Sequence, residues 1–177
     1  MRKLEIGPAA IPLAGYEHLD IKDGPHVEYV ADASKSLPFE DNIFDEIYCS
    51  HLIEHIDHRH TIETLTEWFR ILKTGGFLDV WTLDFRKIAT LYLRNKHSID
   101  EWYPDNPDKI GALWAAKRIF YWDDDPNGSM WHKACFDKEY LTYCFFKAGF
   151  KRVRALETEE NFGHDYGYLN MGIRGIK

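Results

Sequence analysis

The chain has 177 residues, 45% of them hydrophobic, which is enough for one substantial core and too few for two domains of ordinary size. Its 29 acidic residues outnumber its 22 basic ones and the basic residues form no block, so nucleic acid is not expected as a partner. No apolar run approaches the roughly 20 residues of a membrane helix, and residues 1–7 lack the apolar core of a signal peptide. We therefore expect a cytoplasmic protein with no membrane partner.

The amino-terminal half alternates short strand-like runs with glycine and proline. Four strands are predicted, at residues 4–6, 17–21, 27–30 and 46–49. A helix is predicted over residues 61–73, where apolar side chains recur at helical spacing and Gly75 and Gly76 supply a stop.

The carboxyl-terminal half continues the alternation. A strand at residues 77–82, a helical stretch at 83–95 and two last strands at 153–157 and 168–174 are predicted. Asp137 is predicted to cap a helix that runs through Ala148 and is closed by Gly149. Residues 97–131 hold four of the six tryptophans among acidic residues and prolines, and either form an insertion or lid or simply pack. This order of strands and helices is typical of a single α/β domain spanning residues 1–177.

The three cysteines are odd in number and share no CxxC spacing, so neither disulfides nor zinc ribbons are expected. Each lies among apolar or aromatic neighbours, where a buried thiol behaves as a small hydrophobic group. They are Cys49, Cys135 and Cys144.

The segment from Gly7 to Asp20 is a strand end, a Gly/Pro loop and a second strand that ends in a carboxylate. In open α/β sheets ligands bind beyond the carboxyl ends of the strands, and an acidic side chain at the end of the second strand can accept hydrogen bonds from both ribose hydroxyls. The interval is too short for the GxGxxG loop and full helix of a dinucleotide site. A ligand with a ribose and no phosphates, such as S-adenosylmethionine, fits the spacing better.

Three further segments carry a family signature. They are DASKSLPFEDNIFDEIYCSHLIEH at residues 32–55, WFRILKTGGF at 68–77 and HKACFDKEYL with AGF at 132–141 and 148–150. Together they resemble the small class I S-adenosylmethionine-dependent methyltransferases, particularly the predicted ones found beside polysaccharide-modifying genes. The resemblance implies a Rossmann-like class I methyltransferase fold, with a seven-stranded, mostly parallel sheet, an antiparallel last strand and helices on both faces. It also implies methyl transfer from S-adenosylmethionine to a small-molecule or glycan acceptor, and it allows for a homo-oligomer.

The resemblance carries roles over to individual residues. The loop of Gly7, Pro8 and Ala9 would approach the methionine end of the cofactor, and Asp20 would bind the ribose. The remaining cofactor contacts would come from Asp32 and Ala33 at the adenine and from Ser50 and His51 beside the sulfonium and the acceptor. Imidazole titrates near neutral pH, so His51 and His132 are the candidate general bases.

Two alternatives remain open at this point. The family usually shows GxG where this chain has Gly7-Pro8-Ala9, and the missing second glycine is compatible with a binding protein that keeps the fold and uses no cofactor. His51 and His55 flank Glu54 in an HxxEH pattern, as in a zinc hydrolase. The methyltransferase signature contains the same letters, and there we expect Glu54 and His55 to be local hydrogen-bonding partners. No metal site is assigned.

Overall fold

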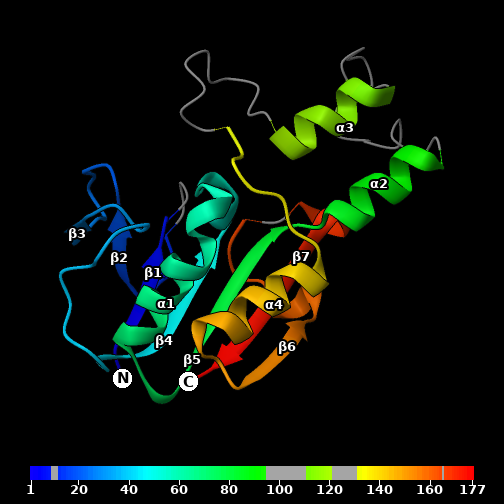
Figure 1. Ribbon diagram of the computed structural model, residues 1–177. Helices are drawn as coiled ribbons and strands as arrows, with labels where there is room; N and C mark the ends of the chain where they lie inside the picture. Colours follow the sequence, from blue (N-terminus) through cyan, green and yellow to red (C-terminus); the bar gives the residue numbers. More distant parts are fainter. Residues whose placement is uncertain (9–11, 95–110, 121–130, 165) are drawn as a thin grey trace.

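A computed structural model describes residues 1–8, 12–94, 111–120, 131–164 and 166–177 (Figure 1). The seven strands are β1 (Lys3–Ile6), β2 (Glu17–Asp20), β3 (Tyr29–Val30), β4 (Phe44–Ser50), β5 (Leu72–Leu83), β6 (Arg152–Leu156) and β7 (Asn170–Ile176). The α-helices are α1 (Thr61–Ile71), α2 (Phe85–Leu93), α3 (Gly111–Phe120) and α4 (Lys138–Ala148). Short 3-10 turns are η1 (Ile53–His55), η2 (His58–His60), η4 (Thr158–Glu160) and η5 (Gly167–Leu169).

The strands form one sheet in the order β3-β2-β1-β4-β5-β7-β6. Strands β1 to β5 pair in parallel, and β7 runs antiparallel to both β5 and β6. The strand order therefore reverses beside β1, and the carboxyl ends of β1, β2, β4 and β5 meet at one edge of the sheet. The predicted fold class is confirmed, including the single antiparallel strand at the end of the chain.

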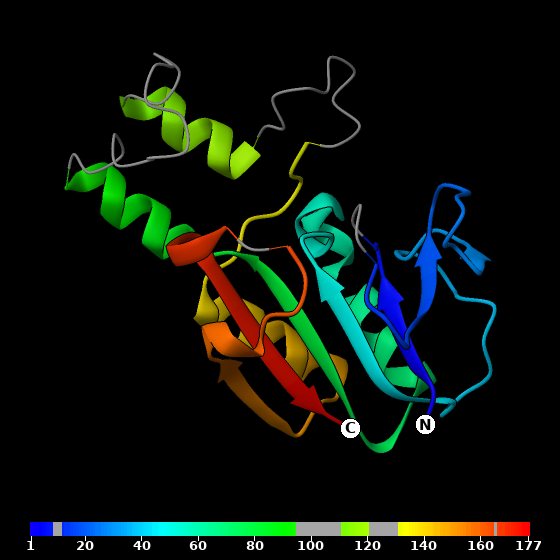
Figure 2. The same ribbon diagram turned by 180° about the vertical axis from the view of Figure 1, so that it is seen from behind.

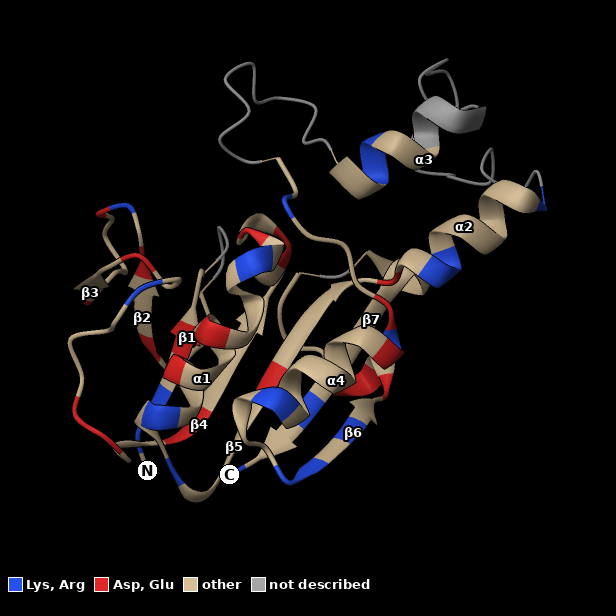
Figure 3. Ribbon diagram, viewed as in Figure 1, with Lys and Arg blue, Asp and Glu red and all other residues tan. Residues whose placement is uncertain are grey.

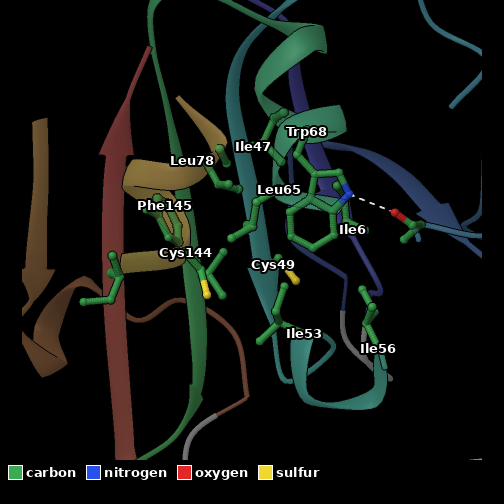
Figure 4. Packing of buried hydrophobic residues seen from close by; sticks show 14 of the residues in the cluster. Ile6, Ile47, Cys49, Ile53, Ile56, Leu65, Trp68, Leu78, Cys144 and Phe145 are labelled. Atoms are coloured by element: carbon green, nitrogen blue, oxygen red, sulfur yellow. Dashed lines mark hydrogen bonds between the residues drawn. The ribbon is translucent and has the colours of Figure 1, made fainter. Parts of the chain in front are cut away.

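Helices α1 and α4 lie side by side over one face of the sheet (Figure 1). The main core fills the space between them and the strands, and Trp68, Leu65 and Phe145 are fully buried in it (Figure 4). The indole Nε1–H of Trp68 donates a 3.0 Å hydrogen bond to the carbonyl of Ala33, which ties α1 to the loop after β3. Cys49 and Cys144 belong to this core, as expected, whereas Cys135 is exposed.

The helices are distributed less evenly than predicted. Seen from behind, the second face of the sheet shows its strands directly, and α2 and α3 lie beyond the carboxyl edge of the strands (Figure 2). Of the described residues, the side chains of Leu13 and Tyr16 pack over this face against Tyr48 and Trp81. The face also holds a bidentate ion pair from Arg174 on β7 to Asp79 on β5, with both N···O distances at 2.6 Å. Loops and polar contacts cover this side where we expected helices.

Element boundaries follow local chemistry. The Asp137 carboxylate accepts a 2.8 Å hydrogen bond from Tyr140 N at the start of α4, and Gly149 ends that helix at φ 109°, so both predicted caps are confirmed. Helix α1 ends at Ile71, before the predicted stop, because Leu72 already pairs with Phe44 as part of β5. Of the predicted insertion at residues 97–131, positions 97–110 and 121–130 lie outside the described residues.

Both ends of the chain lie at the amino-terminal edge of the parallel strands, opposite α2 and α3 (Figure 1). Arg2 N donates a 2.7 Å hydrogen bond to Asp45. At the other end, Lys177 Nζ donates to the carbonyls of Phe69 and Arg70 in the last turn of α1, at 2.7 and 3.1 Å. These contacts anchor both ends to the sheet and its helix.

Acidic and basic side chains are interspersed over the view in Figure 3, with basic positions on β6 and α4 and acidic ones on β1 and α1. No helix among the described residues is long and apolar enough to cross a membrane.

Candidate active site

The glycine turn after β1 borders the carboxyl edge of the sheet. Gly7 has a φ of 73°, in the left-handed region, and its N–H donates a 2.9 Å hydrogen bond to the carbonyl of Leu19 on β2. A Cβ at this position would lie only 2.9 Å from Leu52 Cδ1 in the loop after β4. Glycine therefore permits both the backbone conformation and the close packing of the two loops. Pro8 follows in the described chain, and Ala9 lies outside the described residues.

Asp20 is the last residue of β2, at the same edge. Its Oδ1 accepts a 2.8 Å hydrogen bond from Lys22 N, which is the geometry of a turn-forming aspartate. Its Oδ2 makes no hydrogen bond with a described residue. The next side chain, Ile21, is 64% exposed. An apolar surface therefore lies beside the carboxylate oxygen that has no partner among the described residues.

Asp32 and Ala33 follow β3 and have different surroundings. Asp32 Oδ1 accepts from the backbone N–H and the hydroxyl of Ser34, at 2.9 and 2.7 Å. Burial acts to raise the pKa of Asp32, but these hydrogen bonds and the positive charges of Lys35 and Lys133 outweigh it and lower that pKa. Ala33 is buried in the main core and its carbonyl is taken by Trp68. Asp32 is thus the more accessible of the two.

Ser50 is the last residue of β4, and His51 follows it. Ser50 Oγ lies 3.5 Å from the carbonyl of His164. His51 has a φ of 52°, unusual for a residue other than glycine, and its N–H bonds the Trp81 carbonyl at 2.9 Å. Its ring packs edge-to-face against the rings of Tyr166 and His164, with centroids 4.7 and 5.8 Å away. The ring orientation is therefore held from several sides.

His51 and Glu54 form a buried pair. Glu54 Oε1 lies 3.0 Å from His51 Nδ1, and the two side chains are 3% and 9% exposed. Burial works against ionisation of Glu54, but the hydrogen bond and electrostatic attraction to His51 outweigh it and lower the pKa of Glu54. The ionised carboxylate of Glu54 accepts from Nδ1–H of the His51 ring. His51 Nε2 is buried and has no hydrogen-bond partner among the described residues. The predicted local role of Glu54 is confirmed.

His132 lies elsewhere in the region. Its Nδ1 is 3.1 Å from the Ile119 carbonyl, and its ring packs against that of His55 at 4.8 Å. It lines a pocket together with Glu54, and the next two residues, Lys133 and Ala134, both donate backbone hydrogen bonds to the Glu54 carbonyl. His51 does not line this pocket. The two candidate bases thus lie in different surroundings, connected by Glu54.

The HxxEH letters do not form a metal-binding group here. His51 bonds to Glu54, whereas His55 packs against His132. Burial and the nearby His132 and Lys133 outweigh the attraction of Glu54 and lower the pKa of His55. Within the described part of the chain, no group of three or more His, Cys, Asp and Glu side chains is arranged to hold a metal ion.

Several residues of this region escaped the sequence-based prediction. His164 and Tyr166 reach His51 from a segment more than a hundred positions away along the chain, and no local pattern marks them. Thr82 lines the pocket beside Glu54, but inside an apolar strand its hydroxyl gives no signal.

Comparison with known proteins agrees with the fold. Residues 4–80 match the family model described as a methyltransferase domain. A demethylmenaquinone methyltransferase of Renibacterium salmoninarum is 29% identical over 114 residues, which cover 60% of this chain. That match covers 46% of the relative, so the chain spans less than half the length of this curated protein.

Solved structures match over nearly the whole chain. A methyltransferase from Thermotoga maritima, described as a possible histamine N-methyltransferase, is 23% identical with a TM-score of 0.61, covering 99% of this chain and 82% of that one. One from Methanosarcina mazei is 17% identical with a TM-score of 0.60, covering 99% and 92%. At these identities the structures show the fold, and the family model adds the signature in residues 4–80. The chain thus carries a methyltransferase-domain signature in residues 4–80, on a fold that it shares with S-adenosylmethionine-dependent methyltransferases.

Proposed function

We propose that this chain transfers a methyl group from S-adenosylmethionine to a small-molecule or glycan acceptor at the carboxyl edge of the sheet, with His51 as the general base. One observation carries the proposal: a buried histidine, oriented by a carboxylate through Nδ1, has an Nε2 without a partner among the described residues, beside the strand ends that suit the cofactor. Cytoplasmic location belongs to the same proposal.

The residues at this edge fit the cofactor. Gly7 has a conformation and a packing contact that a side chain would disturb, so the backbone of its loop can approach a ligand closely. Asp20 has an oxygen to accept from ribose hydroxyls, and Ile21 offers an apolar surface next to it. Asp32 would accept from the adenine, whereas Ala33 would act through the position of its backbone, because its carbonyl is taken by Trp68.

When bound, S-adenosylmethionine supplies a methyl group that its sulfonium has already activated. The protein then has to position the acceptor and take its proton. Glu54 holds the His51 ring in the tautomer that leaves Nε2 free to accept, and Tyr166 and His164 restrict the ring. The acceptor's proton would go to Nε2. In this scheme Glu54 is a positioning residue, and Ser50 borders the reacting groups.

Isothermal titration with S-adenosylmethionine tests the cofactor site, and labelled methyl transfer to a panel of small amines, alcohols and sugars tests the activity. His51→Asn is the variant of choice, because asparagine tolerates the left-handed backbone at this position. We expect it to bind the cofactor like the parent and to lose 10²- to 10⁴-fold in transfer rate, the range for general-base catalysis.

His58→Asn is the matched control, since His58 is 65% exposed and lies in the same loop region. It should transfer at the parent rate. A folded parent that binds no cofactor would favour the alternative of a non-catalytic binding protein, and a His51→Asn variant with full activity would remove His51 from the mechanism.

A further inference from the structure

A second feature at this edge is a pocket between the end of β5, the turn η1, helix α3 and the segment before α4. It has room for about one water-sized group and is partly open to solvent. An ammonium group is of that size, so the pocket suits the head group of a small molecule and not the whole of it. Its polar side chains include Glu54, Thr82 and His132.

The polar atoms of the pocket are mainly hydrogen-bond acceptors. Glu54 Oε2 and Thr82 Oγ1 are buried and have no partner among the described residues, and these two residues are only 2% and 1% exposed. His132 lines the same pocket, and its Nδ1 donates to the Ile119 carbonyl at 3.1 Å. A carboxylate oxygen and a hydroxyl oxygen therefore lack a donor among the described residues.

Leaving such groups unpaired in a buried site costs free energy, most of all for a charged oxygen. The first oxygen of Glu54 bonds to His51, and the second oxygen of this pocket-lining residue is buried without a partner among the described residues. Arg118, the basic residue of the lining, already interacts within the chain. A ligand with several N–H donors and a positive charge supplies what the two acceptors lack.

The rest of the lining is apolar. Leu83, Ile88 and Phe136 are buried side chains of the pocket wall, and Phe85 is 41% exposed at its border. An acidic head group is excluded from the floor by repulsion from Glu54. The walls in turn select a ligand whose body is aliphatic or aromatic.

We propose that this pocket binds the amino group of a small amine with an apolar body, through Glu54 and Thr82. That the amine is also the methyl acceptor rests on the proposed function, whereas its binding does not. The two parts are therefore tested separately.

The probe is phenethylamine, titrated by heteronuclear NMR into the full chain without cofactor at pH 7. We expect saturable shifts of the backbone amides of residues 82–85 and 132–136. The anionic analogue 3-phenylpropanoate should not bind, and 2-phenylethanol should bind at least tenfold more weakly, because each keeps the ring and loses the charge or the donors.

Two variants address the acceptors. Glu54→Gln should weaken phenethylamine binding at least tenfold, and the exposed Glu159→Gln should leave it unchanged. Thr82→Val is the more sensitive test: it should weaken binding about three- to tenfold without lowering the melting temperature, since the hydroxyl it removes has no partner in the free protein. A purely structural role for Thr82 predicts the reverse.

Equal binding of the amine and the propanoate, shifts confined to other residues, parent-like binding by both variants, or no binding of phenethylamine at millimolar concentration would each overturn the pocket assignment. The cofactor titration is independent. Cofactor binding without amine binding removes only this inference, and amine binding without cofactor binding removes only the methyltransferase proposal.

Discussion

Asp20 ends β2 with one carboxylate oxygen engaged in its own turn and the other free of described partners. If the free oxygen and its neighbour hold the ribose, Asp20→Ala should cost on the order of 2 to 4 kcal/mol of cofactor affinity, because hydrogen bonds to a charged group are worth roughly 1.5 to 3 kcal/mol each and do not add fully. Titration calorimetry measures the change. Asp23→Ala, in the same exposed turn, serves as the control. An Asp20 variant with parent affinity would show that the residue only forms the turn.

A comparison of Gly7 with Gly15 measures how much the close packing at Gly7 contributes to stability. Both have positive φ values, 73° and 82°, so alanine should cost about 1 to 2 kcal/mol of folding stability at either position. Only at Gly7 would the new Cβ also meet Leu52, whereas nothing lies within 4 Å at Gly15. Denaturant unfolding should therefore show Gly7→Ala as the more destabilised variant. Equal losses would mean that Leu52 moves aside freely.

At the scale of elements, the turn η4 is held by one carboxylate. Glu160 accepts from Arg154 in a bidentate pair at 2.6 and 2.8 Å and from Glu157 N at 3.0 Å. The hydrogen bonds from Arg154 and Glu157 lower the pKa of Glu160 from 4.5 to about 2. A lowered native pKa stabilises the fold above the unfolded value and loses that contribution as the pH falls through the native one.

Glu160→Gln should accordingly destabilise the protein by about 1 kcal/mol at pH 7, because exposed pairs seldom contribute more. The difference between parent and variant should shrink as the pH falls from 4.5 toward 2. Thermal unfolding at a series of pH values checks this, with Glu159→Gln as the neighbouring control. If the difference in stability stays constant with pH, the loss in the variant comes from altered packing and not from the lost charge.

At the scale of the whole molecule, the indole of Trp68 joins the main core to the loop after β3, which we propose borders the cofactor. Trp68→Phe leaves the Ala33 carbonyl without its donor and a void in α1, so we expect a loss of about 2 to 4 kcal/mol in stability together with weaker cofactor binding. Trp81→Phe is matched in size, because Trp81 is equally buried and its Nε1 has no partner among the described residues. Its loss of stability should be smaller. Similar losses of stability in both variants would show that the hydrogen bond of Trp68 contributes little to stability.

The sequence was informative where its signals are local. Gly7 follows β1, and Asp20 and Ser50 are the last residues of β2 and β4. Hydrophobic pattern and turn residues mark these strand ends, and parallel strands bring their carboxyl ends to one edge. Asp137 and Gly149 were readable for the same reason, since caps depend on one or two residues.

What escaped prediction depends on contacts between distant segments. Helix α1 ends at Ile71 and not at the predicted residue 73, because Leu72 pairs with Phe44 of β4 in the sheet. The helical pattern of the sequence does not reveal this pairing. His164 and Tyr166 meet His51 only after β7 has returned along β5. His51 likewise combines a left-handed backbone with a hydrogen bond to Trp81 on the neighbouring strand, which lies 30 positions further along the chain.

The position of the two chain ends has a practical consequence for experiments on this protein. Arg2 and Lys177 are anchored at the edge of the sheet opposite α2 and α3, away from the proposed cofactor site (Figure 1). A biotin or a fluorophore attached at either end would leave the carboxyl edge of the sheet exposed to solvent. The protein can thus be immobilised on a sensor surface in a single orientation, with small molecules delivered to its open side.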